Sequence, residues 1–310
     1  MTQPGTGKYD RVLERCRGLD PIPTAVAWPC EETALAGAID AAREGLIVPI
    51  LVGSAKVIQD IAKAKGIDLG KTEIVDVADS RAAAAKAVAL VREGKAELVM
   101  KGSLHSDEIL AAVIAKETGL RTGRRLSHVF LMDVPAYHKA LIVTDAAINI
   151  APTLEDKVDI VQNAIDLAKS FGVERPKVAI LAAVETVNSK MQATLDAAAL
   201  CKMADRGQIK GGLLDGPLAF DNAISKDAAK IKGITSDVAG DPDILLAPDL
   251  EAGNMMAKQL SYLANADSAG LVLGARVPVI LTSRSDSLRS RIASTAVAVL
   301  AAHARRKPPQ

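Results

Sequence analysis

The segment IVPILVGSAKVIQDIAKAKGIDLGKTEIVDV, residues 47–77, contains two short apolar runs separated by a longer stretch rich in alanine and lysine. The runs at 47–53 and 72–77 contain many β-branched residues, which favours buried strands. The stretch at 54–65 has the period of an amphipathic helix. A strand, a helix and a second strand in this order predict a βαβ unit and a parallel sheet.

The same alternation extends over the rest of the chain, so we expect an α/β protein whose parallel sheet is covered by helices on both faces. Strands are predicted at 24–28, 47–53, 72–77, 96–100, 127–132, 140–145, 177–181, 211–216, 243–248, 269–274 and 278–282. Helices are predicted at 31–44, 54–65, 80–94, 155–171, 190–204, 251–264 and 287–303.

The composition indicates a globular protein with two domains and small-molecule partners. The chain has 310 residues, and single hydrophobic cores stop growing at about 250–300 residues. Its net charge is only +1 and aromatic residues make up 2% of it. Neither feature suits a nucleic acid or an anionic membrane as partner.

The cysteines and the apolar segments predict a cytoplasmic location. Cys16, Cys30 and Cys201 are widely spaced, which argues against a zinc site and against a secreted disulfide framework. The first residues lack the apolar core of a signal peptide. The longest apolar stretch, 292–302, is shorter than the ~20 residues that span a bilayer.

Polar side chains collect where strands end, which is where parallel α/β folds bind ligands. After the strand at 96–100 comes KGSLHSDE, in which Lys101 and His105 precede a helix. Free N–H groups at a helix start, together with a lysine, favour an anion. The alternative is that Ser106 caps the helix, which would also explain the polar residues.

A basic cluster lies at 119–130, where Arg121, Arg124 and Arg125 surround Gly123. Guanidinium groups bind phosphate through two parallel hydrogen bonds, so the cluster suits a phosphate-bearing ligand. The alternative is a solvated basic edge. His128 falls inside an apolar strand and is interpreted as a core residue.

Three further strand exits carry polar residues, and each could also be ordinary helix capping. Their candidate binding residues are Thr144 and Asp145 at the close of 140–145 with Asn149 after it, Asp215 and Asp221 in LLDGPLAFDN, and Asp249, Asn254 and Lys258 in PDLEAGNMMAK.

Taken together, these loops resemble the phosphate acetyltransferase and phosphate butyryltransferase family, with the butyryltransferase branch closer. The matching words include MKGSLHSDE, GLRTGRRLSHVFLMDVP, TDAAINIAP, DGPLAFDNA, PDLEAGN and TSRSDS, in this order between about residues 96 and 300. The three C-terminal words are the most specific, and residues 1–95 match mainly in pattern.

The resemblance implies an enzyme that moves a short acyl group, acetyl to butyryl, between coenzyme A and inorganic phosphate. It implies two three-layer α/β/α lobes like those of isocitrate and isopropylmalate dehydrogenases, with a cleft between them. The first lobe would contain residues 1–133 and 275–310, and the second 134–274, with a boundary at DVPAYHK. It also implies a homodimer that holds no metal or permanent cofactor and uses acyl-CoA as substrate.

For catalysis, the resemblance assigns a serine–arginine pair to Ser283 and Arg284. The acid that serves the coenzyme A thiol in the acetyltransferase branch falls on Ser290, so that assignment does not transfer. Asp286 is the nearest carboxylate and replaces it as a candidate, although it could instead cap a helix. A cysteine found in some acetyltransferases is Ala146 here.

The missing acid motivates a second hypothesis, in which the chain is a non-catalytic regulatory domain that senses acyl-CoA. A third hypothesis, a decarboxylating dehydrogenase, would need an acidic metal cluster and a nucleotide site, and neither is found in the sequence.

Overall fold

A computed structural model describes residues 7–282 and 286–306. The chain divides into a first unit, Asp10–Arg124 with Ala269–Gln310, and a second unit, Met1–Tyr9 with Arg125–Ser268. Residues 125–133 thus group with the second unit, whereas they were expected in the first lobe. The reason is that the strand at 127–133 pairs with the strand at 141–144. The exact lobe boundary stays a prediction.

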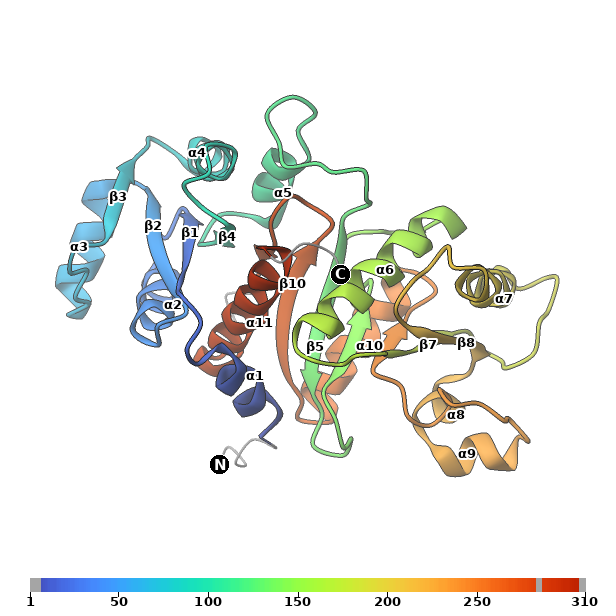
Figure 1. Ribbon diagram of the computed structural model, residues 1–310. Coiled ribbons are helices and arrows are strands. Elements are labelled where there is room, and N and C mark those ends of the chain that lie inside the picture. The colour runs from blue at the N-terminus through green and yellow to red at the C-terminus, as the bar shows by residue number, and fades with distance from the viewer. Residues whose placement is uncertain (1–6, 283–285, 307–310) are drawn as a thin grey trace. The chain divides into compact units, whose positions relative to one another are not determined.

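The first unit contains the strand order β3-β2-β1-β4-β11-β10 (Figure 1). Its neighbouring strands are parallel, except that β10 and β11 are antiparallel. The strands are β1 (Ile22–Ala27), β2 (Ile47–Gly53), β3 (Glu73–Asp76), β4 (Leu98–Lys101), β10 (Asp267–Leu273) and β11 (Val279–Ile280). The helices are α1 (Lys8–Cys16), α2 (Glu32–Arg43), α3 (Ala55–Lys65), α4 (Ser80–Arg92), α5 (Ser106–Ile114) and α11 (Leu288–Arg306). The first two residues of α1 and of β10 belong to the second unit.

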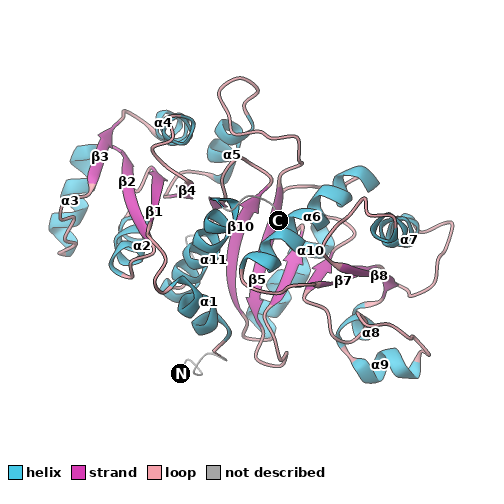
Figure 2. Cartoon of the chain, viewed as in Figure 1, coloured by secondary structure: helices cyan, strands magenta, loops and turns pink. Residues whose placement is uncertain are grey.

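The second unit contains the strand order β5-β6-β9-β7-β8 (Figure 2). β5 and β6 are antiparallel, and the other neighbours are parallel. The strands are β5 (Ser127–Asp133), β6 (Leu141–Thr144), β7 (Lys177–Leu181), β8 (Leu213–Leu218) and β9 (Ile244–Leu246). The helices are α6 (Leu154–Ser170), α7 (Gln192–Asp205), α8 (Phe220–Ile224), α9 (Lys226–Ile231) and α10 (Leu250–Leu263).

The α/β class and the predicted strands are confirmed, but the sheet, expected to be parallel, also contains two antiparallel pairs. β5 and β6 are joined by residues 134–140, and β10 and β11 by residues 274–278. Both connections are too short for a crossover and therefore form antiparallel pairs. The short helices α1, α8 and α9 were not predicted.

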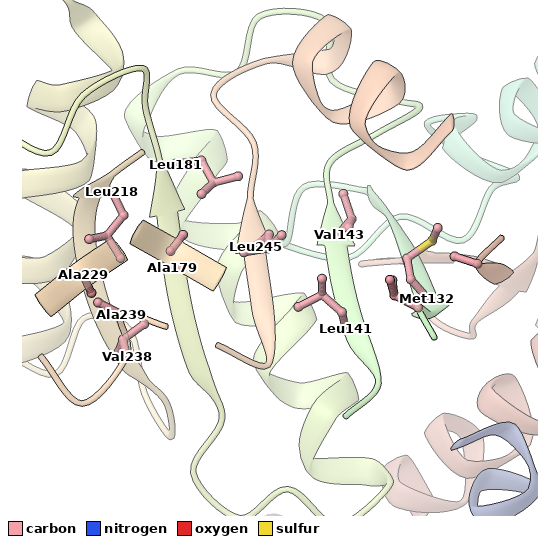
Figure 3. Packing of buried hydrophobic residues seen from close by; sticks show 13 residues of the cluster. Met132, Leu141, Val143, Ala179, Leu181, Leu218, Ala229, Val238, Ala239 and Leu245 are labelled. Carbon is pink, nitrogen blue, oxygen red and sulfur yellow. The ribbon is translucent and has the colours of Figure 1, made fainter. Parts of the chain in front are cut away.

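The hydrophobic cluster in Figure 3 lies on one face of the central strands of the second unit. On the opposite face Ile142, Ile180 and Ile244 are buried as well. Met132, Val143, Ala179 and Leu245 are fully buried. Alternate strand residues point to opposite faces, so strands buried on both faces need near-continuous apolar sequences. This explains why β6 and β9 read as LIVT and ILL.

A buried ion pair joins two helices of the second unit. Lys157 Nζ of α6 donates to Asp196 Oδ2 of α7 at 2.6 Å, and Gln192 donates to the other carboxylate oxygen at 2.7 Å. Both charged side chains are about 95% buried. Since each charge is desolvated, the pair depends on both partners being present.

Among the described residues, no helix combines the length and apolar character needed to cross a membrane.

Candidate functional site

The second unit has a topological switch point between β6 and β9. The chain leaves β6 through α6 and passes β9 to reach β7, whereas it leaves β9 through α10, which packs on β6 and β5. Since crossovers are right-handed, the two helices cover opposite faces of the sheet, as Figure 1 shows. Ligands bind outside the carboxyl ends of strands at such a point. The predicted Asp145, Asn149 and Asp249 all follow these two strands.

The turn after β6 is organised by Asp145, whose side chain is buried. Its Oδ1 accepts hydrogen bonds from Ala147 N at 2.9 Å and Ile148 N at 3.0 Å. Its Oδ2 accepts from Asn149 Nδ2 at 2.6 Å and His128 N at 3.2 Å. Both carboxylate oxygens are therefore used to hold the protein's own backbone and amide.

The start of α10 packs directly on this turn. Asp249 caps the helix by accepting from Ala252 N at 2.8 Å. Asn254 Nδ2 donates to Ala146 O at 2.9 Å. Gly253 approaches so closely that a Cβ on it would lie 2.2 Å from the backbone oxygen of Asp145. The word PDLEAGN thus contains the cap of α10, Asp249, and two residues that fix the helix against the β6 exit, Gly253 and Asn254.

Two buried residues complete the β5–β6 corner. Thr144 Oγ1 donates to His128 O at 2.9 Å, which ties β6 to β5. His128 is buried as predicted, and burial lowers its pKa to about 4, so the imidazole is neutral at pH 7. Its Nδ1 has no hydrogen-bond partner among the described residues, however, so the histidine is not fully satisfied there.

Arg125 is the cation that the structure brings to this corner. Its Nε donates to Asn149 Oδ1 at 2.8 Å and lies 3.5 Å from a carboxylate oxygen of Asp156 on α6. The side chain is 54% exposed. The predicted Arg125, Asp145 and Asn149 are therefore neighbours, whereas Asp156 was not predicted from the sequence to join them.

The first unit has a second switch point, between β1 and β4. From β1 the order runs outward through β2 to β3, and the chain then returns to place β4 on the other side of β1. Gly102 N donates to Ala27 O at 2.8 Å, and Ser103 N donates to Trp28 O at 2.9 Å. A Cβ on Gly102 would lie 2.5 Å from both of these oxygens, so the close approach of the two strand exits requires glycine.

A small pocket of about 20 Å³ opens at this second switch point, with room for about one water molecule. It is lined by polar residues of four segments of the first unit, including Glu31, Thr33, Lys101, Ser103 and Arg291. Lys101 is buried, and its Nζ lies 3.3 Å from Gly102 O and 3.4 Å from Thr282 O. A buried ammonium is suited to an anion.

The predicted pair Ser283 and Arg284 follows Thr282 in the sequence and lies outside the described residues. Asp286 is half-buried, and its backbone oxygen accepts from Arg291 Nε at 3.2 Å. The capping bond of α11 comes from Ser287, whose Oγ accepts from Ser290 N at 3.1 Å. The residue that caps α11 is therefore Ser287 and not Asp286.

Two predicted residues of the first unit lie in exposed loops. His105 occupies the N-cap position of α5, one residue before the expected Ser106, and its N–H donates to Glu108 Oε2 at 3.0 Å. Arg124 is exposed, and its N–H donates to Thr122 Oγ1 at 3.1 Å.

Three further predicted residues of the second unit are not brought to the β6–β9 corner by any hydrogen bond or ion pair of the described residues. Asp215 lies inside β8 rather than after it, because the strand continues to Leu218. Asp221 lies 3.4 Å from Lys232 Nζ, which also pairs with Glu185 at 3.0 Å. Lys258 is exposed on α10, one turn beyond Asn254.

Comparison with known proteins identifies the family. Residues 80–299 match the family described as "Phosphate acetyl/butaryl transferase". The chain is 62% identical over 299 residues to the phosphate acetyltransferase of Rhizobium meliloti, covering 96% of this chain and 95% of that protein. The chain belongs to this family. The β6–β9 switch point, the β4 side of the other switch point and the segment at 283–286 fall within the matched residues.

The other likenesses agree with this result. The phosphate butyryltransferase of Clostridium beijerinckii is 44% identical, with 95% of this chain and 97% of that protein covered. These identities do not single out the butyryltransferase branch. A phosphotransacetylase structure from Streptococcus pyogenes matches with a TM-score of 0.82 at 23% identity, covering 98% of this chain and 100% of that chain.

The dehydrogenase-like fold class is also confirmed. A 4-hydroxythreonine-4-phosphate dehydrogenase from Burkholderia phymatum matches with a TM-score of 0.51 at 13% identity, over 91% of this chain and 98% of that chain, and this likeness concerns the fold alone. Family membership makes the chain a phosphate acyltransferase, as expected from its sequence. Nothing in the comparisons supports the non-catalytic alternative. Among the described residues, no group of three or more histidine, cysteine and acidic side chains could hold a metal.

Proposed function

We propose that the chain transfers an acetyl, propionyl or butyryl group between coenzyme A and inorganic phosphate, and that acetyl-CoA is its best substrate. The observation that carries the proposal is the 62% identity to a phosphate acetyltransferase over nearly the whole of both chains. The two polar switch points support it, since both substrates are anionic and need fixed cations and N–H donors.

In the reaction, a phosphate oxygen attacks the thioester carbonyl carbon and forms a C–O bond. The tetrahedral oxyanion then collapses, the C–S bond breaks, and the sulfur leaves as a thiolate that takes up a proton. Catalysis therefore needs cations for phosphate, a donor for the oxyanion and a group that handles the thiol proton.

We assign these roles as follows. Arg284 and Ser283 contact phosphate and the oxyanion, and Asp286 handles the thiol proton. Lys101 is proposed to bind phosphate as well. Its ammonium lies 3.4 Å from the carbonyl oxygen of Thr282, the residue that directly precedes Ser283 in the sequence.

The remaining predicted residues divide into two groups. Those that point outward are proposed to bind coenzyme A, namely His105, Arg124, Arg125, Asp221 and Lys258. Those that bond the protein's own backbone are proposed to fix the loops, namely Thr144, Asp145, Asn149, Asp215, Asp249 and Asn254.

The activity is tested by following free thiol during incubation with acetyl-, propionyl- and butyryl-CoA, with and without phosphate. The acyl phosphate is trapped separately with hydroxylamine. We expect thiol release that requires phosphate and matches the hydroxamate formed, fastest with acetyl-CoA. Coenzyme A binding without phosphate-dependent release would refute the proposal and favour the regulatory hypothesis.

The role of Lys101 is tested by Lys101→Met, which keeps the apolar stem and removes the charge. A charge-assisted hydrogen bond contributes about 1.5–3 kcal/mol, so kcat/KM for phosphate should fall about 10- to 100-fold. Lys95→Met is the matched control, since Lys95 is exposed and pairs with Glu93 at 2.8 Å. Equal rates in the two variants would remove Lys101 from the site.

The role of Asp286 is tested against that of Ser287. Asp286→Asn should slow turnover and change its pH profile with little change in melting temperature. Ser287→Ala removes the cap of α11 and should cost about 1 kcal/mol of stability with activity retained. The opposite pattern would assign the structural role to Asp286.

The proposed assembly is a homodimer. On α10, Met255, Tyr262 and Leu263 are 58%, 77% and 81% exposed, and a second copy would cover such apolar side chains. Sedimentation velocity should show a dimer for the wild type and a monomer for Tyr262→Glu with Leu263→Glu. A monomeric wild type would refute the assembly.

The proposed location is the cytoplasm, with small molecules rather than nucleic acids as partners. All three cysteines are free, which suits a reducing compartment.

A further inference from the structure

The backbone and the side chain of Arg125 are both fixed in the second unit. Its N–H donates to Asp159 Oδ2 at 2.7 Å, and its carbonyl oxygen accepts from Asn163 Nδ2 at 3.0 Å. Its Nε donates to Asn149 Oδ1 at 2.8 Å. Neither terminal guanidinium nitrogen donates a hydrogen bond to any of the described residues. The arginine is therefore held at three points and still offers its end-on pair of nitrogens to a ligand.

Asn149 is the residue through which this geometry is set. Its side chain is buried, and Nδ2 donates to Leu126 O at 2.8 Å and to Asp145 Oδ2 at 2.6 Å. With two acceptors facing Nδ2, the amide oxygen must face Arg125, so the amide orientation is unambiguous. Asp145 is itself fixed by three backbone N–H groups. A rigid series of contacts thus runs from the β6 exit to the guanidinium.

We propose that Asn149 is a positioning residue that aims the terminal nitrogens of Arg125 at a phosphate group of the substrate. The proposal rests on the proposed function and deepens it. Because Nε is occupied by Asn149, the contact with phosphate is made end-on by the two terminal nitrogens. Holding the fork in advance avoids the ordering cost that a mobile arginine would incur on binding.

The nearest competitor for the guanidinium is the carboxylate of Asp156, 3.5 Å from Nε. In Asn149→Ala the amide acceptor is lost, and Arg125 is expected to turn toward Asp156 and away from the ligand. KM for the substrate whose phosphate it binds should rise about 10- to 100-fold, with kcat changed less. Adding Asp156→Asn should restore part of the loss, because it removes the competing charge and keeps an acceptor for Thr153 N.

The decisive experiment is a double-mutant cycle of Asn149→Ala and Arg125→Ala, read by KM, by kcat and by calorimetric binding of coenzyme A and of inorganic phosphate. If Asn149 acts through Arg125, the double variant should bind no more weakly than Arg125→Ala alone. Multiplying effects would overturn the proposal, as would an unchanged affinity in Asn149→Ala. Gln162→Ala is the matched control, since its amide bonds Asp166 and Lys210 instead.

The arms of the experiment identify the phosphate. If Asn149→Ala raises the dissociation constant of inorganic phosphate alone, Arg125 binds that substrate. If it raises the dissociation constant of coenzyme A alone, Arg125 binds coenzyme A. With 3′-dephospho-coenzyme A, loss of the mutational effect assigns it to the 3′-phosphate, and its retention to the diphosphate. If Asn149→Ala does not fold, Asn149→Ser, with a smaller polar group, enters the cycle. A wild type that binds coenzyme A without turnover refutes the proposed function alone, and the binding cycle still decides the role of Asn149.

Discussion

Replacing Gly253 by alanine tests whether the start of α10 must touch the β6 exit. In the folded chain, the added Cβ would lie 2.2 Å from the backbone oxygen of Asp145 and 3.1 Å from the Cβ of Ala247. Real Cβ atoms essentially never approach closer than 3.0 Å, so α10 and the turn must separate by at least 0.8 Å. The obstacle is backbone, and no side-chain rotation can remove it.

The substitution has two opposing effects on stability. Alanine is favoured over glycine inside a helix by about 0.8–1 kcal/mol. Overpacking costs about 1–3 kcal/mol, and a rigid backbone obstacle belongs at the upper end of this range. We therefore expect a net loss of about 2 kcal/mol, which lowers the melting temperature of a unit of this size by about 4–8 °C.

The assay is thermal unfolding by circular dichroism, combined with phosphate-dependent thiol release. Because the turn also carries Asn149, Gly253→Ala should raise KM as well as lower the melting temperature. The matched control is Gly123→Ala, since a Cβ there meets nothing within 4 Å. It should stay within about 0.5 kcal/mol of the wild type. A Gly253→Ala variant as stable and as active as the wild type would refute the close contact.

Three further predictions concern buried ionisable groups. Burial raises the pKa of Cys16 to about 11 and that of Cys201 to about 12, so iodoacetamide at about pH 8 should label both thiols in urea and neither in the folded chain, as read by peptide mass spectrometry. Lys157→Met leaves a buried carboxylate unpaired and should cost about 3–5 kcal/mol in urea unfolding. Lys157→Met combined with Asp196→Leu should recover most of this loss, and no recovery would contradict the ion-pair account. Burial would raise the pKa of Asp241, but hydrogen bonds from two lysines outweigh it and hold the pKa below its usual range. This stabilisation is complete above the unfolded pKa of about 3.9 and is lost as the pH falls through the folded pKa, so the melting-temperature difference between wild type and Asp241→Asn should shrink from about pH 5 to about pH 2.

The strands could be predicted because each is an apolar, β-branched run bounded by turn residues. β2 and β7 have the predicted limits, 47–53 and 177–181. The helices that were not predicted are short. α8 and α9 have five and six residues, too few to show a helical period. The antiparallel β5–β6 pair could have been inferred from the length of 134–140, which leaves no room for a crossover helix.

The candidate site was predictable only in part, for a related reason. Capping residues and strand exits have local signatures, so Asp145 and Asp249 could be found from the sequence. Two residues of α6, Asp159 and Asn163, hold the backbone of Arg125. They are 34 and 38 positions away from it in the sequence and belong to an ordinary helix surface pattern. Only the fold brings them to the strand exit.

The two switch points also explain why so many polar residues at strand exits face the protein itself. A parallel strand that ends in a tight turn leaves several backbone N–H groups without partners, and burial makes each of them costly. Asp145 satisfies two of these groups in its own turn, and Ser103 Oγ adds a bond to Trp28 O at 2.8 Å in the other unit. Once these demands are met, few groups remain to bind a ligand. In such a site the number of polar residues says little about the number of substrate contacts, and the residues that keep free donors, such as Arg125, should dominate the loss of activity on mutation.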